Sequence, residues 1–339
     1  MSKRFISIAL VLLVSIGLVF AAGGKETTGA KPVVIQLGYE NNPGEPVDLA
    51  AHEWQRIIDE KSNGTMKLEL FPSSQLGSKT DLVDQMLAGS SVCTLADGAF
   101  YAERGVPDFG IVFGPYLFTS WDDCWRLVDS DWYKEQAEKL AKNGLRLISS
   151  NWIYGDRHTL TKKPVHTPSD LRGMKIRVAN SMVFIKGFEV LGATPTPLAL
   201  GEVYTALQQG VVDGLENPLT TLDGGKFQEV AKYLILDGHV KNFTTFIVGE
   251  TFFKSLTAEQ QKILIDSANE AGLYNNSIQV ELEQQAMKNL VAGGVTVYTP
   301  SDAELKLFQD AAKAFYTDPQ VTAKWTPGLY NTVMKAMGK

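Results

Sequence analysis

The chain is poor in the residue types that build most catalytic and metal centres. It has 2 cysteines and 4 histidines among 339 residues, and His52, His158, His166 and His239 lack the short spacing that zinc ligands need. The sequence contains no Gly-x-x-x-x-Gly-Lys-Ser/Thr phosphate loop, no Gly-x-Gly-x-x-Gly dinucleotide fingerprint and no Gly-x-Ser-x-Gly elbow. We therefore expect a protein that is not an enzyme and has no catalytic residues, no cofactor and no bound metal.

The two cysteines allow two interpretations. Cys93 lies in the apolar segment 91–95, and Cys124 lies in a segment of helical character. In an oxidising compartment two thiols can pair, whereas buried free cysteines are common because this residue behaves as a small apolar side chain. We favour free, buried cysteines, although spacing alone does not decide between the two.

Long apolar runs are absent except at the N-terminus. Lys3 and Arg4 precede an apolar run from Phe5 to Phe20, and the small residues Ala21 and Ala22 follow. This order is typical of a secretory signal peptide, and the run is shorter than the roughly 20 apolar residues that span a membrane. We expect cleavage near Ala21 or Ala22, and a soluble periplasmic protein that carries no lipid anchor.

Basic residues are fewer than acidic ones, and arginine is the rarer of the two basic residue types. The net charge is −6, and it becomes −8 when Lys3 and Arg4 leave with the signal peptide. This acidity argues against a nucleic-acid partner. The chain has 8 arginines against 24 lysines, and no arginine occurs in the 162 residues after Arg177. Because lysine supplies the surface charge, each arginine is a candidate for planar, two-pronged binding of a carboxylate or phosphate.

The residues that are present alternate between strand-like and helix-like segments, which predicts an α/β protein. Residues 97–101 are expected to be irregular, and Gly272 is a candidate kink in the last helix. The expected strands cover 33–37, 67–71, 92–96, 145–149, 175–178, 193–195, 211–215 and 243–248. The expected helices cover 45–61, 78–89, a segment after Ser120, 182–191, 202–209 and 257–290.

Two similar α/β blocks with chain crossings between them predict a periplasmic binding protein fold, with two lobes around a ligand cleft. After a signal peptide at 1–22, lobe one comprises 31–150 with about 242–270. Lobe two comprises 151–241 with about 271–339, and a long helix connects the lobes. Ligands in open α/β sheets bind beyond the carboxyl ends of strands. The residues just past predicted strands are Glu40, Asp97, Trp152, Asn180 and Asn217, and we expect them near the crevice.

Arg177 is the arginine best placed to face that crevice. In the segment Lys175-Ile176-Arg177-Val178, alternation puts Ile176 and Val178 on one face of a strand and Arg177 on the other. An arginine in this position can bind a ligand in the cleft, or it can pair with an acidic residue across the sheet. Position alone leaves both interpretations open.

Arg157 and Asn217 also allow two interpretations each, a ligand contact or an ordinary structural role. Arg157 follows the aromatic turn 152–156, where a surface pair with Asp156 is the simpler interpretation. Asn217 precedes Pro218, which restricts it to extended geometry. Its amide can donate to an oxyanion, or it can be an ordinary turn or capping asparagine.

Five stretches of the chain resemble the solute-binding proteins of the tripartite ATP-independent periplasmic (TRAP) transporters, of the dicarboxylate-binding type. Their order and spacing fit across essentially the whole mature chain, and five linked motifs are far more specific than any one of them. The resemblance implies a two-lobed protein that closes on a ligand and delivers it to a two-part, ion-gradient-driven membrane permease. The five stretches are 71–77, 155–157, 170–178, 202–210 and 211–218.

The resemblance also implies roles for individual residues. It gives Arg177 the bidentate contact to a ligand carboxylate, with Arg157, 20 residues earlier, and Asn217, 40 residues later, as its partners. Glu40 and Asp97 then contact the rest of the ligand, which points to hydroxyls, amides or an amine on it. The remaining candidates are Trp152, Phe100 and Tyr204 as an apolar wall, and Asn180 near the crevice.

One segment departs from the family pattern. The loop Glu40–Glu45 lies where the family varies with ligand, so no named substrate is transferred. We expect a monomer that binds a small organic acid and partners with TRAP permease subunits. The alternatives are a periplasmic ligand-sensing subunit, a secreted enzyme on the same scaffold, and a binding protein of an ATP-driven transporter, which should lack the five motifs.

Overall fold

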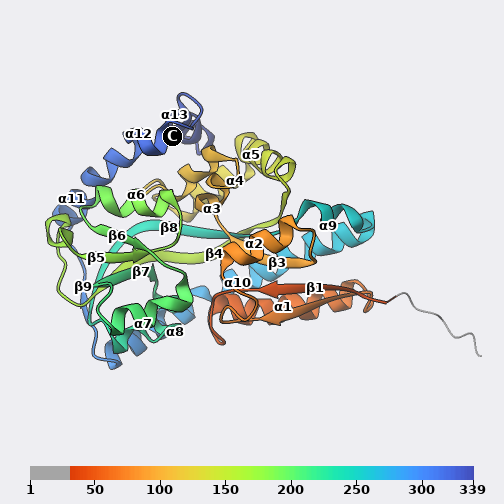
Figure 1. Cartoon of the computed structure of the whole chain (residues 1–339), viewed down its shortest axis with the longest axis horizontal. Helices are drawn as coiled ribbons and strands as arrows, with labels where there is room; N and C mark the ends of the chain where they lie inside the picture. The colour runs from red at the N-terminus through yellow and green to blue at the C-terminus, as the bar shows by residue number, and fades with distance from the viewer. Residues whose placement is uncertain (1–30) are drawn as a thin grey trace, which may run out of the picture. The chain divides into compact units, whose positions relative to one another are not determined.

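A nine-stranded mixed sheet organises the part of the chain that the structure describes, residues 31–339 of a computed structural model (Figure 1). The predicted signal peptide and its cleavage site lie outside these residues. The strand order is β2-β1-β3-β8-β4-β7-β5-β6, and β9 pairs with β8. Among the described helices, none is long and apolar enough to cross a membrane. The predicted α/β class with two lobes is confirmed.

The first half of the sheet is a β-α-β-α-β block, as the sequence predicts. The parallel pairing of β1 with β2 and β3 places the ends of β1 and β3 at one edge. Ser78 caps the second helix through a capping box with Asp81. The block comprises β1 (Val33–Gly38), α1 (Pro46–Lys61), β2 (Met66–Phe71), α2 (Lys79–Leu87) and β3 (Val92–Ala96).

Two long strands, β4 (Leu145–Thr161) and β8 (Tyr233–Gly249), run antiparallel through the middle of the sheet. The sequence predicts only short strands at 145–149 and 243–248, and these predictions are wrong in length. Four register shifts interrupt the β4–β8 pairing, and Gly155 has a positive φ of 130°. Such bulges break the regular alternation that makes a strand visible in the sequence. Three of the shifts lie between Leu147 and Gly155, around the predicted chain crossing.

The second half of the sheet again has parallel strands with helices between them. The structure begins the strand predicted at 211–215 three residues later. Val211 is exposed, and the Asp213 carboxylate accepts from the Lys175 N–H at 2.9 Å, which fixes a turn there. The elements are β5 (Lys175–Val178), α6 (Met182–Val190), β6 (Thr194–Pro197), α7 (Val203–Gln208), β7 (Gly214–Pro218), α8 (Leu219–Gly224) and β9 (Thr296–Tyr298).

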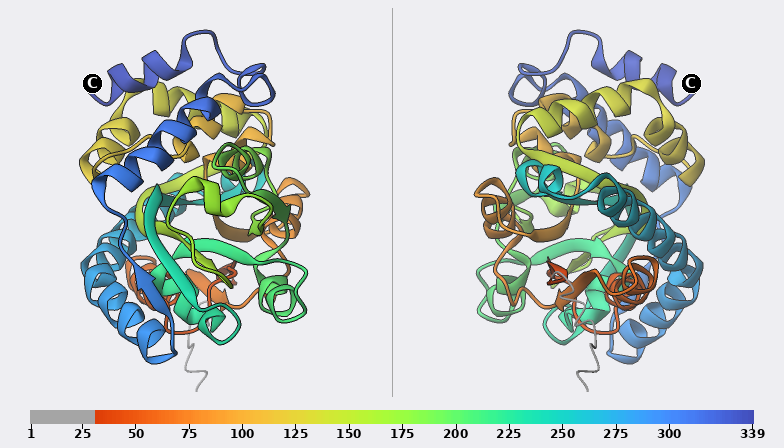
Figure 2. Two further views of the ribbon diagram at one scale, coloured as in Figure 1. Left: turned by 90° about the vertical axis from the view of Figure 1, so that its left-hand side faces the viewer. Right: turned by 90° about the vertical axis from the view of Figure 1, so that its right-hand side faces the viewer.

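Helix α10 (Ala258–Ala292) is 35 residues long and packs against α1, β4 and α8, so it touches both halves of the sheet (Figures 1 and 2). Thr257 caps it through the predicted capping box. The helix continues through Gly272 without a break. A Cβ there would lie 2.3 Å from the Asn151 side-chain oxygen, so glycine permits a close contact with β4 instead of marking a kink.

Short helices complete the fold. Residues 97–101, predicted to be irregular, form α3 because the Asp97 carboxylate accepts from the Ala99 N–H at 3.0 Å and caps a helix. The C-terminal helix packs against α4 and α5 at the top of Figure 1. These helices are α3 (Gly98–Ala102), the 3-10 helix η1 (Pro107–Phe113), α4 (Trp121–Asp129), α5 (Asp131–Lys142), α9 (Glu250–Ser255), α11 (Asp302–Ala312), α12 (Pro319–Thr322) and α13 (Leu329–Ala336).

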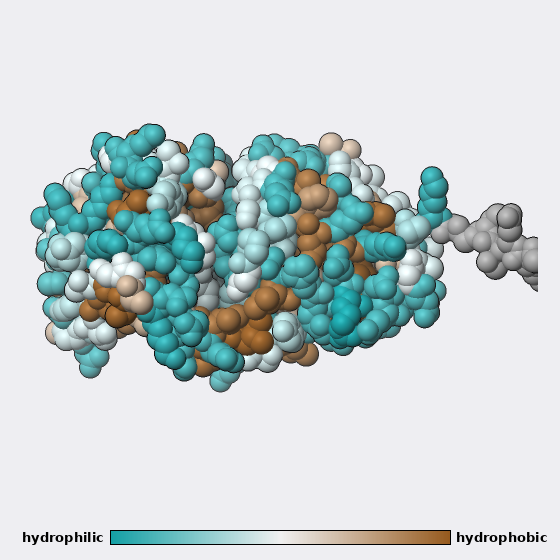
Figure 3. All heavy atoms as spheres, turned by 90° about the horizontal axis from the view of Figure 1, so that it is seen from below, coloured by the Kyte–Doolittle hydropathy of each residue, from teal (hydrophilic) through white to brown (hydrophobic). Residues whose placement is uncertain are grey.

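The buried apolar side chains of the described residues form separate clusters. Cys93 and Cys124 belong to two different clusters, and both are buried and free, which confirms the favoured interpretation. Burial raises the pKa of both thiols. The face seen from below in Figure 3 is mostly hydrophilic, with apolar side chains in separate groups.

Candidate functional site

Six of the nine predicted site residues line one small buried cavity. The cavity has a volume of about 30 Å³ and lies where β1, β3, β4, β5 and β7 end or cross. It adjoins a cavity of about 350 Å³, with which it shares Glu40, Phe100 and Arg177. The six residues are Glu40, Asp97, Phe100, Arg157, Arg177 and Asn217.

Arg177 is a buried cation without a carboxylate partner among residues 31–339. It lies on β5, and its Nε and Nη2 donate to the Leu198 carbonyl at 2.9 and 2.6 Å. No Asp or Glu oxygen of the described chain lies within 4.0 Å of its guanidinium, so the cross-sheet pair considered for it does not form. Burial lowers the pKa of Arg177, although arginine stays charged in proteins. A buried cation of this kind calls for an anion, because an unpaired charge is costly in a protein interior.

Arg157 is also buried, but its charge is already balanced. Its Nε and Nη2 form two parallel bonds to the Glu216 carboxylate at 2.5 and 2.8 Å, and Nη1 donates to Asn242 at 3.0 Å. The surface pair with Asp156 that the sequence allowed does not form, because Asp156 pairs with Lys241 at 2.9 Å. Arg157 therefore faces the cavity as part of a rigid ion pair.

Behind that ion pair, the charges continue in a buried chain. His239 Nε2 lies 3.2 Å from Glu216, and its Nδ1 lies 3.1 Å from Asp237. Burial opposes charge on His239, but Asp237 and Glu216 outweigh it and raise its pKa to about 9. Burial is likewise outweighed at Glu216, where Arg157 and His239 hold the pKa below its usual value. The sequence did not single out His239, because Glu216 lies 23 residues away and the two carboxylates meet at the imidazole only in the folded sheet.

Two uncharged groups complete the arginine end of the cavity. Asn217 is the last residue but one of β7, opposite His158 of β4, and its amide makes no hydrogen bond to another residue in the described chain. Tyr154, which the sequence placed only in a turn, lines the cavity from β4. Its hydroxyl accepts from Asn41 at 3.1 Å, and burial raises its pKa to about 12. Both side chains are available to a ligand as neutral donors.

Acidic residues gather at the opposite end, where β1 and β3 end. Glu40 and Asp97 both line the cavity, and burial raises the pKa of Asp97. Lys79, which the sequence did not single out, lines the same cavity. Its Nζ is 3.8 Å from a Glu40 oxygen and 4.5 Å from the centre of the Phe100 ring. Its only sequence signal was its place directly after the capping residue Ser78.

The remaining predicted residues lie elsewhere. The position predicted for Trp152, at the crevice, is corrected. Its side chain is fully buried in the core, and its indole N–H donates to the Ala268 carbonyl at 3.0 Å. Tyr204 lines a neighbouring cavity of about 250 Å³, and its hydroxyl donates to Glu229 at 2.6 Å. The apolar wall of the small cavity comes instead from Phe100 and Phe184.

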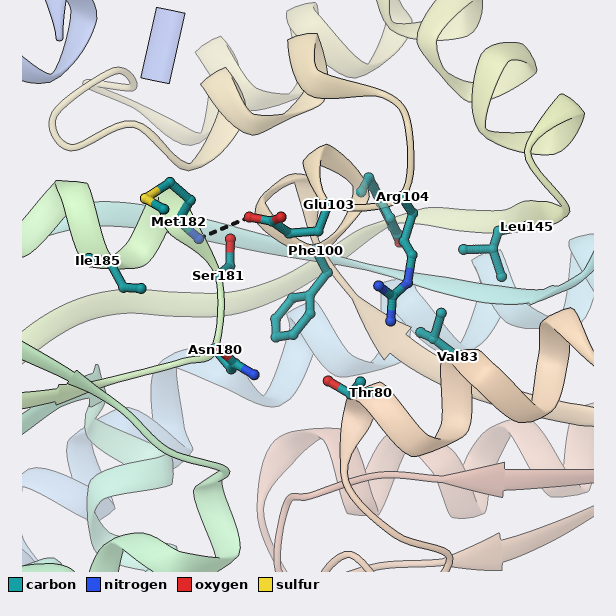
Figure 4. Close-up of a pocket in the computed structure, with 11 residues that line it drawn as sticks. Thr80, Val83, Phe100, Glu103, Arg104, Leu145, Asn180, Ser181, Met182 and Ile185 are labelled. Atoms are coloured by element: carbon teal, nitrogen blue, oxygen red, sulfur yellow. Dashed lines mark hydrogen bonds between the residues drawn. The ribbon is translucent and has the colours of Figure 1, made fainter. Parts of the chain in front are cut away.

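Asn180 lies in a third adjoining cavity, of about 300 Å³, which Figure 4 shows with Phe100 at its centre. Above it, the Glu103 carboxylate accepts from the Met182 N–H at 3.0 Å, and this contact joins the segment after β3 to the start of α6. Asn180 also lines the 350 Å³ cavity. It therefore lines the two larger cavities and not the small one.

Two lobes of α/β structure around a buried, arginine-lined cavity define the class of solute-binding proteins. No group of three or more His, Cys, Asp or Glu side chains within residues 31–339 is placed to hold a metal ion. Residues 37–321 match the family described as bacterial extracellular solute-binding protein, family 7 (DctP). The chain belongs to this family, and the predicted membership is confirmed.

Individual relatives agree with the family match. The 2,3-diketo-L-gulonate-binding periplasmic protein YiaO of Escherichia coli (strain K12) is 31% identical over 278 residues, which cover 82% of this chain and 84% of that protein. A TRAP solute-binding protein of Ochrobacterium anthropi with bound L-fuconate is 42% identical, with a TM-score of 0.86, over 90% of this chain and 99% of that one. A similar protein of Actinobacillus succinogenes 130z, with bound L-galactonate, is 40% identical, with a TM-score of 0.85, at the same coverage.

Proposed function

We propose that this protein captures a small organic acid outside the cytoplasm and presents it to the membrane subunits of a TRAP transporter. The observation that carries the proposal is Arg177, a buried guanidinium that faces a cavity and has no carboxylate of the described chain within 4.0 Å. A ligand carboxylate supplies the missing charge. Charge-assisted hydrogen bonds of this kind contribute about 1.5–3 kcal/mol each.

In this proposal the carboxylate lies between Arg177, Arg157 and Asn217. Arg177 still has free N–H groups on Nη1, because only its Nε and Nη2 donate to Leu198. Arg157 is held in place by Glu216, so its guanidinium costs little entropy to order when the ligand binds. Asn217 adds a neutral donor from the neighbouring strand.

We further propose that the acid is a polyhydroxy monocarboxylate, a sugar acid. Glu40 and Asp97 supply hydrogen-bond acceptors at the far end of the cavity, as hydroxyl groups require. The two solved relatives named above carry L-fuconate and L-galactonate, and both are acids of this class. The carboxylate then occupies the arginine end and the hydroxylated carbons extend toward β1 and β3.

Binding is proposed to close two lobes, of residues 31–150 with about 242–270 and residues 151–241 with about 271–339. The long strands β4 and β8 connect both, and the bulges between Leu147 and Gly155 provide flexible points. Small-angle scattering checks this motion, and we expect the radius of gyration to fall when ligand is added. An unchanged radius with a tightly bound ligand would contradict closure. Export with cleavage near Ala21 or Ala22 is tested separately, by the intact mass of the secreted protein.

The function itself is tested by a thermal-shift screen against dicarboxylates, sugar acids, keto acids and amino-acid derivatives, followed by calorimetry. A true ligand raises the melting temperature with its concentration. We expect Arg177→Lys to lose most of the affinity, because a point charge cannot form the two-pronged contact. Arg56→Lys is the matched control, since Arg56 pairs with Glu53 and Glu60 on the exposed face of α1. Full affinity in Arg177→Lys, or chemical turnover of the bound acid, would refute the proposal.

A further inference from the structure

Lys79 occupies a position that the fold itself does not explain. It is the first residue of α2, where the positive end of the helix dipole disfavours a cation. Its side chain is nevertheless only 13% exposed, and its ammonium group reaches into the site beside Glu40 and over the Phe100 ring. The 3.8 Å separation from Glu40 is too long for a hydrogen bond. Stability is therefore a weak reason for a lysine at this position.

The charges around Lys79 give it a role in binding. The two ends of the site carry three cations, Arg157, Arg177 and Lys79, against three anions, Glu40, Asp97 and Glu216. Arg157 and Glu216 cancel each other at one end, which leaves Arg177 for the ligand carboxylate. After β1 and β3, the two carboxylates Glu40 and Asp97 outnumber the single ammonium group of Lys79. Arg177 acts on Glu40 and Arg157 acts on Asp97 from across the cavity, but a ligand carboxylate on Arg177 offsets that positive charge. A second ligand carboxylate beside Glu40 and Asp97 would then meet like charges, which cost several kcal/mol when placed together across an interface.

A hydroxyl group fits this far end better than any charged group. It donates one hydrogen bond and accepts others, so it can donate to Glu40 or Asp97 and accept from Lys79. Asp97 accepts from the Ala99 N–H through one oxygen at 3.0 Å and lines the cavity. A second ligand carboxylate would meet two carboxylates and could be accepted only by Lys79.

We propose that Lys79, balanced against Glu40 and Asp97, determines specificity at the far carbon of the ligand, accepting a terminal CH₂OH and rejecting a terminal carboxylate. This inference rests on the proposed function, in which Arg177 holds the first carboxylate of a sugar acid. It makes the protein a receptor for aldonates, which have one carboxylate. The matching aldarates, which differ only in a second carboxylate at C6, are excluded.

The test compares such pairs by calorimetry: galactonate with galactarate, gluconate with glucarate, and mannonate with mannarate. For the pair that binds, we expect wild type to prefer the aldonate by at least about tenfold. The double variant Glu40→Gln/Asp97→Asn leaves Lys79 unopposed, and we expect it to shift the ratio toward the aldarate by at least about tenfold. Asparagine is as good a helix cap as aspartate, so α3 is retained.

Lys79→Met is expected to move the ratio the other way, with weaker aldonate binding and stronger rejection of the aldarate. Lys67→Met is the matched control, since Lys67 is an exposed lysine on β2, outside the site, and its ratio should equal that of wild type. Equal affinity of wild type for both members of a pair, or an unchanged ratio in the double variant, overturns the specificity proposal.

The outcomes separate this inference from the function on which it rests. If the ratio does not respond but Arg177→Lys still abolishes binding, the proposed function stands and the role of Lys79 is refuted. If no sugar acid binds and another organic acid binds through Arg177, the far-end proposal is again overturned. If nothing in the panel binds, both proposals fail.

Discussion

Buried carboxylates in and around the cavity have pKa values that are shifted in opposite directions. At the arginine end, Arg157 and His239 hold the pKa of Glu216 below its usual value. In the loops after β1 and β3, burial raises the pKa of Asp97, and it raises that of Glu45 to about 7. Glu45 accepts from Asn41 at 2.6 Å and from Thr221 at 3.1 Å, but no Lys, Arg or His within residues 31–339 pairs with it. Glu216 belongs to a fixed framework of paired charges, whereas Asp97 and Glu45 bind a proton more readily than usual. Glu45 lies outside the small cavity, next to Asn41 and close to Tyr154.

The largest effect is expected from breaking the fixed framework. Glu216→Gln leaves Arg157 and His239 without their shared anion, and removal of one partner of a buried pair costs about 3–5 kcal/mol. Urea denaturation measures this loss in the free energy of unfolding. Asp156→Asn is the control, because the half-exposed pair of Asp156 with Lys241 contributes at most about 1 kcal/mol. Equal losses in both variants would show that the buried ion pairs of Glu216 contribute no more to the free energy of unfolding than the pair of Asp156 with Lys241.

The next effect concerns ligand binding at the same end. We expect Arg177→Ala to weaken binding of the acid by at least about a hundredfold, since truncating one partner of a buried charge pair costs about 2–5 kcal/mol. Arg177→Lys should be nearly as damaging. Calorimetry gives the dissociation constants. A loss of affinity of less than about tenfold in Arg177→Ala would show that other residues bind the anion.

A pH-dependent effect is expected at Glu45, in the loop after β1. The pKa of Glu45 is near 4.5 when the chain is unfolded and about 7 when it is folded, so the folded state holds the extra proton between these values. Stability is therefore lost as pH rises from 4.5 to 7, by about 3 kcal/mol in total. Glu45→Gln removes this loss, so the variant should gain stability relative to wild type across that window. The window of His239, from 6.5 to about 9, is common to both proteins.

Chemical denaturation at several pH values between 4 and 8 measures the difference between Glu45→Gln and wild type. The exposed Glu60→Gln serves as the control for replacing a glutamate outside the buried region. A pH-independent difference between Glu45→Gln and wild type would mean that Glu45 does not hold the extra proton.

The smallest effect is expected at Tyr204, in the cavity that adjoins the site. Tyr204 borders the 250 Å³ cavity next to Glu40, but its hydroxyl is engaged by Glu229. We expect Tyr204→Phe to change the affinity for the acid by less than about threefold, because the phenyl ring stays in place. Calorimetry checks this value. A tenfold loss would extend the binding site into that cavity and restore the role predicted for Tyr204.

The sequence predicted the α/β class, the first three strands and the group of residues that meet at the cavity. The strands follow from local pattern, and Glu40, Asp97 and Asn217 follow from the rule that strand ends share an edge. The binding roles of Arg157 and Arg177, and the place of Phe100, came from the family resemblance. The partner of Arg157 could not be predicted, since Glu216 lies 59 residues away and is brought close only by the β4–β7 register. Trp152 was misplaced because the bulges of β4 change which face its side chain takes.

The pairing of β3 with β8 also fixes the order in which the chain can fold. Cys93 pairs in register with Val248, and the core around Ile35 and Leu68 also contains Phe246 and Ala268. The first half of the chain to be synthesised therefore lacks part of its own interior until about residue 268 has emerged. Folding that waits for such distant contacts is slow. Neither half of the chain should fold as a separate fragment, because each needs strands or helices from the other to complete its core.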